Sequence, residues 1–251
     1  MIKALFRYGA FLLGVYLCVL IYSLPASFVY NKFITLPSGI TVQGISGSIW
    51  SGQLNTLNVD GYDIENLRWS LVFSELLRGD VAIDWSVDNE MGTLNGQAHL
   101  DQQTIHLSAV KGNLDMAALS QKFAQQNFFA SGILLLDIQE YSFTLDKLKR
   151  ARGTMTWQQA NLLAPVTMDL GGITTTLHEN DGALLVRFVD TGHAVDLSGE
   201  AQLSNWQQYT YQLRFGVRDT TATGVVDVFN LMGLPDDDGY VSLEGDGRIQ
   251  M

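Results

Sequence analysis

The chain has very little sulfur chemistry available to it. Among 251 residues there is one cysteine, Cys18, and it lies inside an apolar N-terminal stretch. The rest of the chain therefore has neither a disulfide framework nor a thiolate metal site. A lone cysteine in such a setting usually behaves as a small hydrophobic side chain.

Recognisable catalytic motifs are also missing. The sequence has no G-x-S-x-G elbow, no P-loop and no dinucleotide fingerprint. The four histidines show no spacing that would let two of them bind one metal: His99, His106, His178 and His193. The acidic run 236–239 lacks the alternating ligands and distal Glu of an EF-hand, so we expect a solvated hairpin there. We predict no cofactor, no metal and no enzymatic activity.

Charge is scarce and unevenly placed. Charged residues make up 16% of the chain and the net charge is −11. Every Asp and Glu lies at or beyond Asp60, so residues 33–251 carry 12 basic and 26 acidic side chains. Such an acidic domain repels phosphate groups, which argues against nucleic-acid binding and against flat adhesion to a membrane surface.

An uncharged stretch near the N-terminus predicts a membrane anchor. No charged residue occurs between Tyr8 and Asn31, and the densest part, 8–24, spans about 25 Å as a helix at about 1.5 Å per residue. Flanking residues extend it to the roughly 30 Å of a hydrocarbon core. We expect a transmembrane segment over 8–30.

The basic residues around this segment predict its orientation. Lys3 and Arg7 precede it and only Lys32 follows closely, which favours a cytoplasmic N-terminus over 1–7 and an exported remainder. The alternative is a cleaved secretory signal. The candidate sites at Ala26 and Ser27 lack the small-x-small pattern, so an uncleaved anchor in the bacterial inner membrane is favoured.

Beyond the anchor, alternation of apolar and polar residues predicts antiparallel strands. The clearest segments are 81–87 and 211–218. In the second, Tyr211, Leu213, Phe215 and Val217 fall on one side, as in a half-buried strand. Helix is sparse: we expect one short amphipathic helix over 114–126 and a single turn over 74–77.

A short phrase recurs in which glycine precedes alternating apolar residues. It begins at the following glycines: Gly47, Gly96, Gly112, Gly132, Gly153, Gly199 and Gly224. We expect each glycine to supply the turn or bulge that opens a new strand.

The order of these phrases suggests a duplication. Segment 94–100 matches 197–203, and 112–119 matches 224–231, at similar offsets. The predicted fold is mainly β: an elongated or curled antiparallel meander of two similar halves, about 40–140 and 150–251, after one transmembrane helix. The halves would stack as one continuous sheet because neither covers its own apolar face.

Five tryptophans offer two interpretations: Trp50, Trp69, Trp85, Trp157 and Trp206. Bulky aromatics on half-buried strands usually form core. A long sheet with little helix to cover it would also present an apolar groove for acyl chains or for a partner's apolar segment. The candidate groove residues are Trp50, Trp85, Leu136, Trp157 and Val226.

Three segments carry a resemblance to a known family: 47–54, 67–71 and 75–80, which read GSIWSGQL, LRWSL and ELLRGD. They resemble the N protein of bacterial type II secretion systems. The resemblance implies a short cytoplasmic N-terminus, one anchor and a periplasmic β domain. It also implies a role with the inner-membrane platform or secretin-linked components that export folded proteins across the outer membrane. It carries over no functional residue.

A second family gives the alternative hypothesis. The repeated strand–glycine phrases are also similar to AsmA-like envelope proteins, which are thought to carry lipid along a hydrophobic β groove. The short chain argues against a complete bridge across the periplasm but allows a short adaptor. An envelope hydrolase is a third hypothesis.

Overall fold

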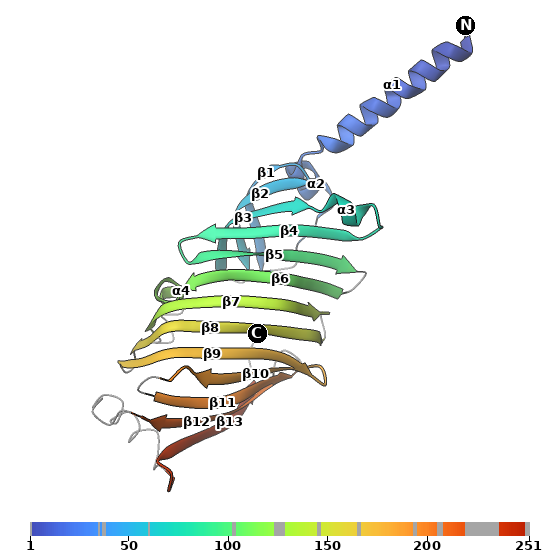
Figure 1. Ribbon diagram of the computed structural model, residues 1–251. Helices are drawn as coiled ribbons and strands as arrows, with labels where there is room; N and C mark the ends of the chain where they lie inside the picture. The colour runs from blue at the N-terminus through green and yellow to red at the C-terminus, as the bar shows by residue number, and fades with distance from the viewer. Residues whose placement is uncertain are drawn as a thin grey trace.

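The computed structural model describes residues 2–34, 36, 39–59, 61–101, 104–122, 129–144, 147–164, 167–192, 195–204, 208–218 and 236–248. They form one antiparallel sheet of 13 strands in which neighbours in the sequence are neighbours in space. Figure 1 shows the strands in this order, from β1 beside the N-terminal helices to β13 at the other end. The predicted antiparallel meander is confirmed.

The strands are long and regularly paired. In chain order they are β1 (Ile40–Gly47), β2 (Ser51–Val59), β3 (Tyr62–Leu71), β4 (Val81–Asn89), β5 (Gly92–Asp101), β6 (Thr104–Asp115), β7 (Phe129–Phe143), β8 (Leu148–Ala164), β9 (Met168–Asn180), β10 (Ala183–Asp190), β11 (Val195–Ser204), β12 (Gln208–Val217) and β13 (Tyr240–Arg248). Within the described residues β1 and β13 each pair with one strand only, so the sheet is not closed.

Helices are few and lie at the margins of the sheet. They are α1 (Ile2–Tyr22), α2 (Ala26–Phe33), α3 (Phe73–Leu76) and α4 (Met116–Lys122). The single turn expected over 74–77 is α3, and α4 lies within the helix expected over 114–126. The Asp115 carboxylate accepts hydrogen bonds from the backbone N–H groups of Ala117 and Ala118, which explains where α4 begins.

The N-terminal segment is divided at Pro25. α1 ends at Tyr22 and α2 begins at Ala26, because proline has no N–H to continue the helical hydrogen bonds. α1 projects away from the sheet (Figure 1). Among the residues that the structure describes, no helix combines the length and the apolar character needed to cross a membrane.

The described phrase glycines do not open strands, so that part of the expectation was wrong, but register shifts at Gly96 and Gly132 are bulges of the kind expected. Gly96, Gly112, Gly153 and Gly199 lie inside β5, β6, β8 and β11. The reason is close packing: a Cβ on Gly199 would lie 2.3 Å from the carbonyl oxygen of Gln212 on the next strand. These glycines let neighbouring strands and their large side chains approach, which no other residue would allow.

The hydrophobic core is best formed near the C-terminal end of the sheet. Ile173, Val195, Leu197 and Val241 are buried together, and side chains from β8, β9, β12 and β13 pack around them. β10 is short, and the two strands that pair with it, β9 and β11, also contact each other. Pairing is unbroken from β1 to β13, including across 140–150 where we expected two halves to meet. The internal duplication stays a prediction.

Candidate functional site

One face of the sheet is apolar along its whole length. A row of directly opposed residues, one from each strand, contains no charged side chain: Ile45, Leu54, Leu67, Val87, Leu94, Gly112, Leu136, Met155, Thr175, Phe188, Gly199, Leu213 and Leu243. Directly opposed residues in antiparallel strands point to the same side. Each of the 13 is buried or half-buried. We call this side the apolar face.

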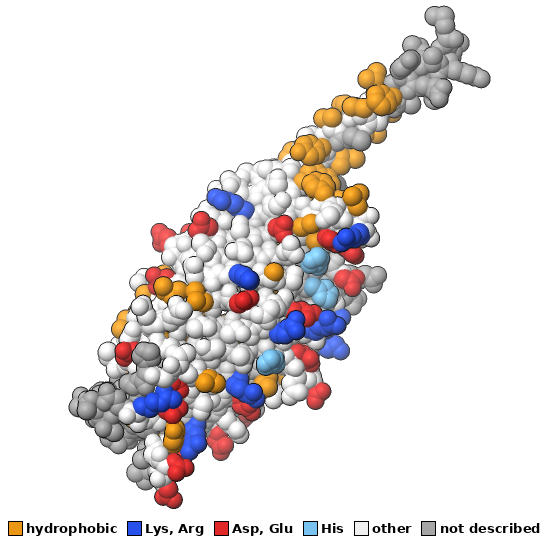
Figure 2. Space-filling view, viewed as in Figure 1, with side chains coloured by type: hydrophobic (Ala, Val, Ile, Leu, Met, Phe, Trp, Pro, Cys, Tyr) orange, Lys and Arg blue, Asp and Glu red, His pale blue; other side chains and the backbone are white. Residues whose placement is uncertain are grey.

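The opposite side is polar along the same path. The neighbouring row, shifted by one residue in every strand, is Ser46, Gln53, Arg68, Ser86, Asn95, Lys111, Asp137, Thr154, Thr176, Arg187, Glu200, Gln212 and Glu244. We call this side the polar face. Figure 2 shows charged side chains of both signs spread over the sheet. The two rows fix the register, because a slip of one residue would exchange the faces.

Three of the five predicted groove residues lie on the apolar face. Leu136 on β7 belongs to the row itself. Trp157 on β8 is opposite Leu134, which lies two residues before Leu136 on β7 and therefore on the same face. The Trp157 Nε1–H donates to the carbonyl oxygen of Ser131 at 3.1 Å. Trp85 lies three strands away on β4, opposite Trp69. The structure therefore brings Leu136 and Trp157 together and leaves Trp85 at a distance along the same face.

The other two groove residues do not join them. Trp50 follows β1 in a loop, where its ring stacks on Phe73 with centroids 5.5 Å apart and its Nε1–H donates to the carbonyl oxygen of Ile21 at 3.0 Å. It connects α1 to the sheet. Val226 lies outside the described residues. The groove as a ligand site stays a prediction.

Sequence reasoning did not single out how tryptophan and glycine pair on this face. Trp69 covers Gly52 on the adjacent strand, where a Cβ would lie 2.4 Å from the indole ring. Trp85 lies opposite Gly96 in the same way. Such aromatic–glycine pairs pin the register of neighbouring strands. Their spacing in sequence becomes informative only once the strand pairing is known.

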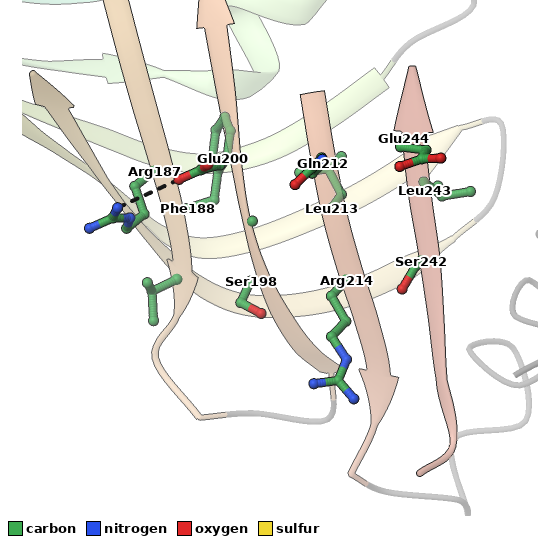
Figure 3. A pocket seen from close by; sticks show the side chains of 12 residues that line it. Arg187, Phe188, Ser198, Glu200, Gln212, Leu213, Arg214, Ser242, Leu243 and Glu244 are labelled. Carbon is green, nitrogen blue, oxygen red and sulfur yellow. Dashed lines mark ion pairs between the residues drawn. The ribbon is translucent and has the colours of Figure 1, made fainter. Parts of the chain in front are cut away.

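The polar face carries a hollow near β13, shown in Figure 3. It has a volume of about 510 Å³ and is lined by residues of β10 to β13. Arg187 pairs with Glu200 at 3.5 Å across the floor, and Arg214 lies 3.4 Å from Asp236. Ser198 and Ser242 also line the hollow, and none of its described lining residues is a histidine. Its arginines are paired with acids, and the arrangement provides no activated nucleophile.

A charge cluster fastens the strand ends beside this hollow. Arg218 pairs with Asp190 and, at 3.2 Å, with Asp196, and the Tyr240 hydroxyl donates to Asp196 at 2.9 Å. Burial alone would raise the pKa of Asp190, but hydrogen bonds from Arg218 and from the N–H groups of Gly192 and Leu197 lower it overall. The bond to Asp196 raises the pKa of Tyr240. The cluster joins β10, β11, β12 and β13.

The polar residues considered as metal ligands are dispersed. His99 and His106 are direct partners on the neighbouring strands β5 and β6. His178 lies on β9, and His193 falls outside the described residues. Asp236 closes a turn by accepting the N–H groups of Asp238 and Tyr240. In the described ranges no three His, Cys, Asp or Glu side chains come together as metal ligands.

Comparison with known proteins identifies relatives along nearly the whole chain. The protein N of Klebsiella pneumoniae is 29% identical over 210 residues, covering 81% of this chain and 80% of that protein. The protein N of Aeromonas hydrophila is 26% identical over 249 residues, covering 96% and 97%. Each is named type II secretion system protein N. No solved structure matches the chain.

The family comparison covers the sheet from before β1 into β13. Residues 38–244 match the family described as "Type II secretion system (T2SS), protein N". The match includes the three segments on which the resemblance was first seen and both rows of the sheet. The chain belongs to the type II secretion system protein N family.

Proposed function

We propose that this chain is a non-enzymatic component of a bacterial type II secretion system, held in the inner membrane by α1 with its sheet in the periplasm. There it supports the export of folded exoproteins together with the membrane platform or secretin-linked components. The observation that carries the proposal is the family match over 38–244, which spans almost the entire sheet.

The anchor is supported by the sequence and by the exposure of α1. Its stretch from Tyr8 to Tyr22 has no charged residue. Large hydrophobic side chains of α1 are exposed, among them Phe11, Leu12, Tyr16, Val19 and Tyr22. Apolar surface of this kind gains free energy when it enters hydrocarbon. The excess of basic residues before the segment supports a cytoplasmic N-terminus.

The shape of the sheet supports a structural role. Thirteen strands at about 4.8 Å spacing extend over roughly 58 Å from β1 to β13. With α1 in the bilayer, this strand spacing would place β13 on the order of 50 Å from the membrane. Among the described strands β13 pairs only with β12, so its outer edge is a suitable place for another strand to pair.

The test is secretion by the bacterium that carries this gene. Deletion should leave exoproteins in the periplasm, and the intact gene supplied in trans should return them to the medium. A form in which a cleavable signal replaces residues 1–24 should reach the periplasm but restore secretion poorly. Normal secretion by the deletion strain would contradict the proposal.

A second candidate function is lipid binding, and the uninterrupted apolar face favours it. The row of uncharged residues offers an acyl chain a continuous path across 13 strands. Leu136 lies in the middle of this path and is half-buried, whereas its neighbour Asp137 is exposed on the polar face. The pair allows the two faces to be compared at one point in the sheet.

The experiment compares lipid retained by three purified full-length chains. Mass spectrometry should detect phospholipid or lipopolysaccharide with the wild type and with Asp137→Lys, and much less with Leu136→Lys, because a charge on the apolar face opposes an acyl chain. Equal retention by both variants would remove lipid carriage as a function of this face.

A further inference from the structure

The end of the sheet beside α1 has an unusual concentration of exposed apolar side chains. Phe73 is 51% exposed, Leu76 39% and Leu77 91%, all within five residues around α3. On α2 and just after it, Phe28 is 50% exposed and Ile34 52%. We call these five residues the apolar rim. Exposed apolar side chains grouped in this way mark an interaction surface.

Contacts fix the rim to the end of α1. The Trp50 ring stacks on Phe73 while its Nε1–H donates to the carbonyl oxygen of Ile21 in the last turn of α1. The N–H of Ile49 donates to the carbonyl oxygen of Leu24 at 3.1 Å. α3 is thereby held beside the point where α1 leaves the sheet (Figure 1). Figure 2 shows hydrophobic side chains continuing from α1 onto this end of the molecule.

Basic groups lie close to the rim. The Lys32 ammonium is 5.7 Å from the centroid of the Phe28 ring. Arg78 directly follows Leu77 and pairs with Glu75 at 2.9 Å, with 70% of its side chain exposed. Apolar side chains flanked by Lys and Arg are typical of surfaces that lie in the headgroup region of a bilayer.

We propose that the apolar rim inserts into the outer surface of the same bilayer that holds α1, and so sets the sheet upright on the membrane. This inference rests on the anchor under "Proposed function". The charge distribution agrees with it, because the acidic sheet is repelled by anionic headgroups when it lies flat and not when it stands on its end. The occupant is therefore lipid, because the Trp50 contacts hold the rim beside the end of α1.

Depth-dependent quenching tests the inference on the full-length chain. Cys18→Ser removes the native thiol, and a single cysteine is then introduced as Leu77→Cys on the rim or Thr210→Cys, exposed on β12, as the matched control. Each variant carries an environment-sensitive dye in vesicles of phosphatidylethanolamine and phosphatidylglycerol with doxyl-labelled lipid. We expect several-fold stronger quenching of the dye in the Leu77→Cys variant than in the control.

Flotation of the same vesicles after alkaline extraction measures the anchor separately. Protein that floats, with equal weak quenching at both positions, would overturn the rim and leave the anchor standing. Protein that does not float would overturn both. If the thiol of the Leu77→Cys variant is protected in native membranes but unquenched in pure lipid, a protein covers the rim and the inference is also wrong.

Discussion

Two tryptophans on the apolar face differ in one hydrogen bond, which allows a direct prediction at the residue scale. The Trp157 Nε1–H donates to Ser131, whereas the Trp85 Nε1 is buried without a partner among the described residues. Both substitutions to phenylalanine remove similar apolar area. Trp157→Phe should lower the free energy of unfolding by about 1 kcal/mol more than Trp85→Phe, because it alone leaves a carbonyl unsatisfied.

Urea unfolding of the two full-length variants in detergent, followed by circular dichroism, measures this difference. A larger loss for Trp85→Phe would show that its indole nitrogen has a partner that the described residues do not supply.

The Asp190–Arg218 pair predicts an acid-sensitive contribution to stability. The Asp190 side chain is only 4% exposed, and its pKa is lowered from the ordinary value of 3.8. A carboxyl group whose pKa is lowered by folding stabilises the folded chain at pH values above its ordinary pKa. This stabilisation is lost as the pH falls through the pKa of the group in the folded chain. Asp190→Asn should cost about 1–3 kcal/mol at neutral pH.

Thermal unfolding as a function of pH tests this. The loss of stability below pH 4 should be smaller in Asp190→Asn than in the wild type, while Asp246→Asn, at an exposed position on β13, serves as the control. Identical pH profiles for Asp190→Asn and the wild type would exclude this role for the pair.

At the scale of single elements, the glycines inside strands should tolerate no side chain. A Cβ on Gly199 would overlap the carbonyl of Gln212 and lie 2.8 Å from the Leu213 Cα. Gly199→Val should destabilise the protein by about 1–3 kcal/mol through overpacking. Ser198→Val, the neighbouring residue on the polar face of β11, should be close to neutral. Chemical unfolding compares them, and equal stabilities would contradict the proposed close approach of β11 and β12.

Much of the element-level structure follows from local sequence. Strict alternation predicted β4 over 81–87 and β12 over 211–218, because side chains in strands point alternately to opposite faces. The bulges were predicted only in part. We expected them at glycines, and register shifts do fall at Gly96 in β5 and at Gly132 in β7. Beside these shifts, however, Ala109 and Gln159 also have positive φ. Neither residue type signals this conformation, which depends on how adjacent strands pair.

At the scale of the whole molecule, sequence predicted the antiparallel meander but neither that the sheet is open nor where its aromatic residues lie. Trp50 was assigned to the groove because it is a large aromatic residue. Only the folded chain shows that its hydrogen bond to Ile21 joins α1 to the loop after β1. Leu136 and Trp157 were expected together and are found on neighbouring strands. Contacts between segments as distant as Trp50 and Phe73 depend on the complete topology, which alternation does not encode.

The central claim is that α1 holds the sheet outside the cytoplasm, and the activity of a C-terminal reporter tests it most directly. Alkaline phosphatase, which folds actively only after export, is joined to the end of the full-length chain in intact cells. We predict high activity, and retention of the fusion in the membrane fraction after alkaline extraction. An inactive fusion, or active fusion released as a soluble protein shortened near Ala26, would contradict the claim.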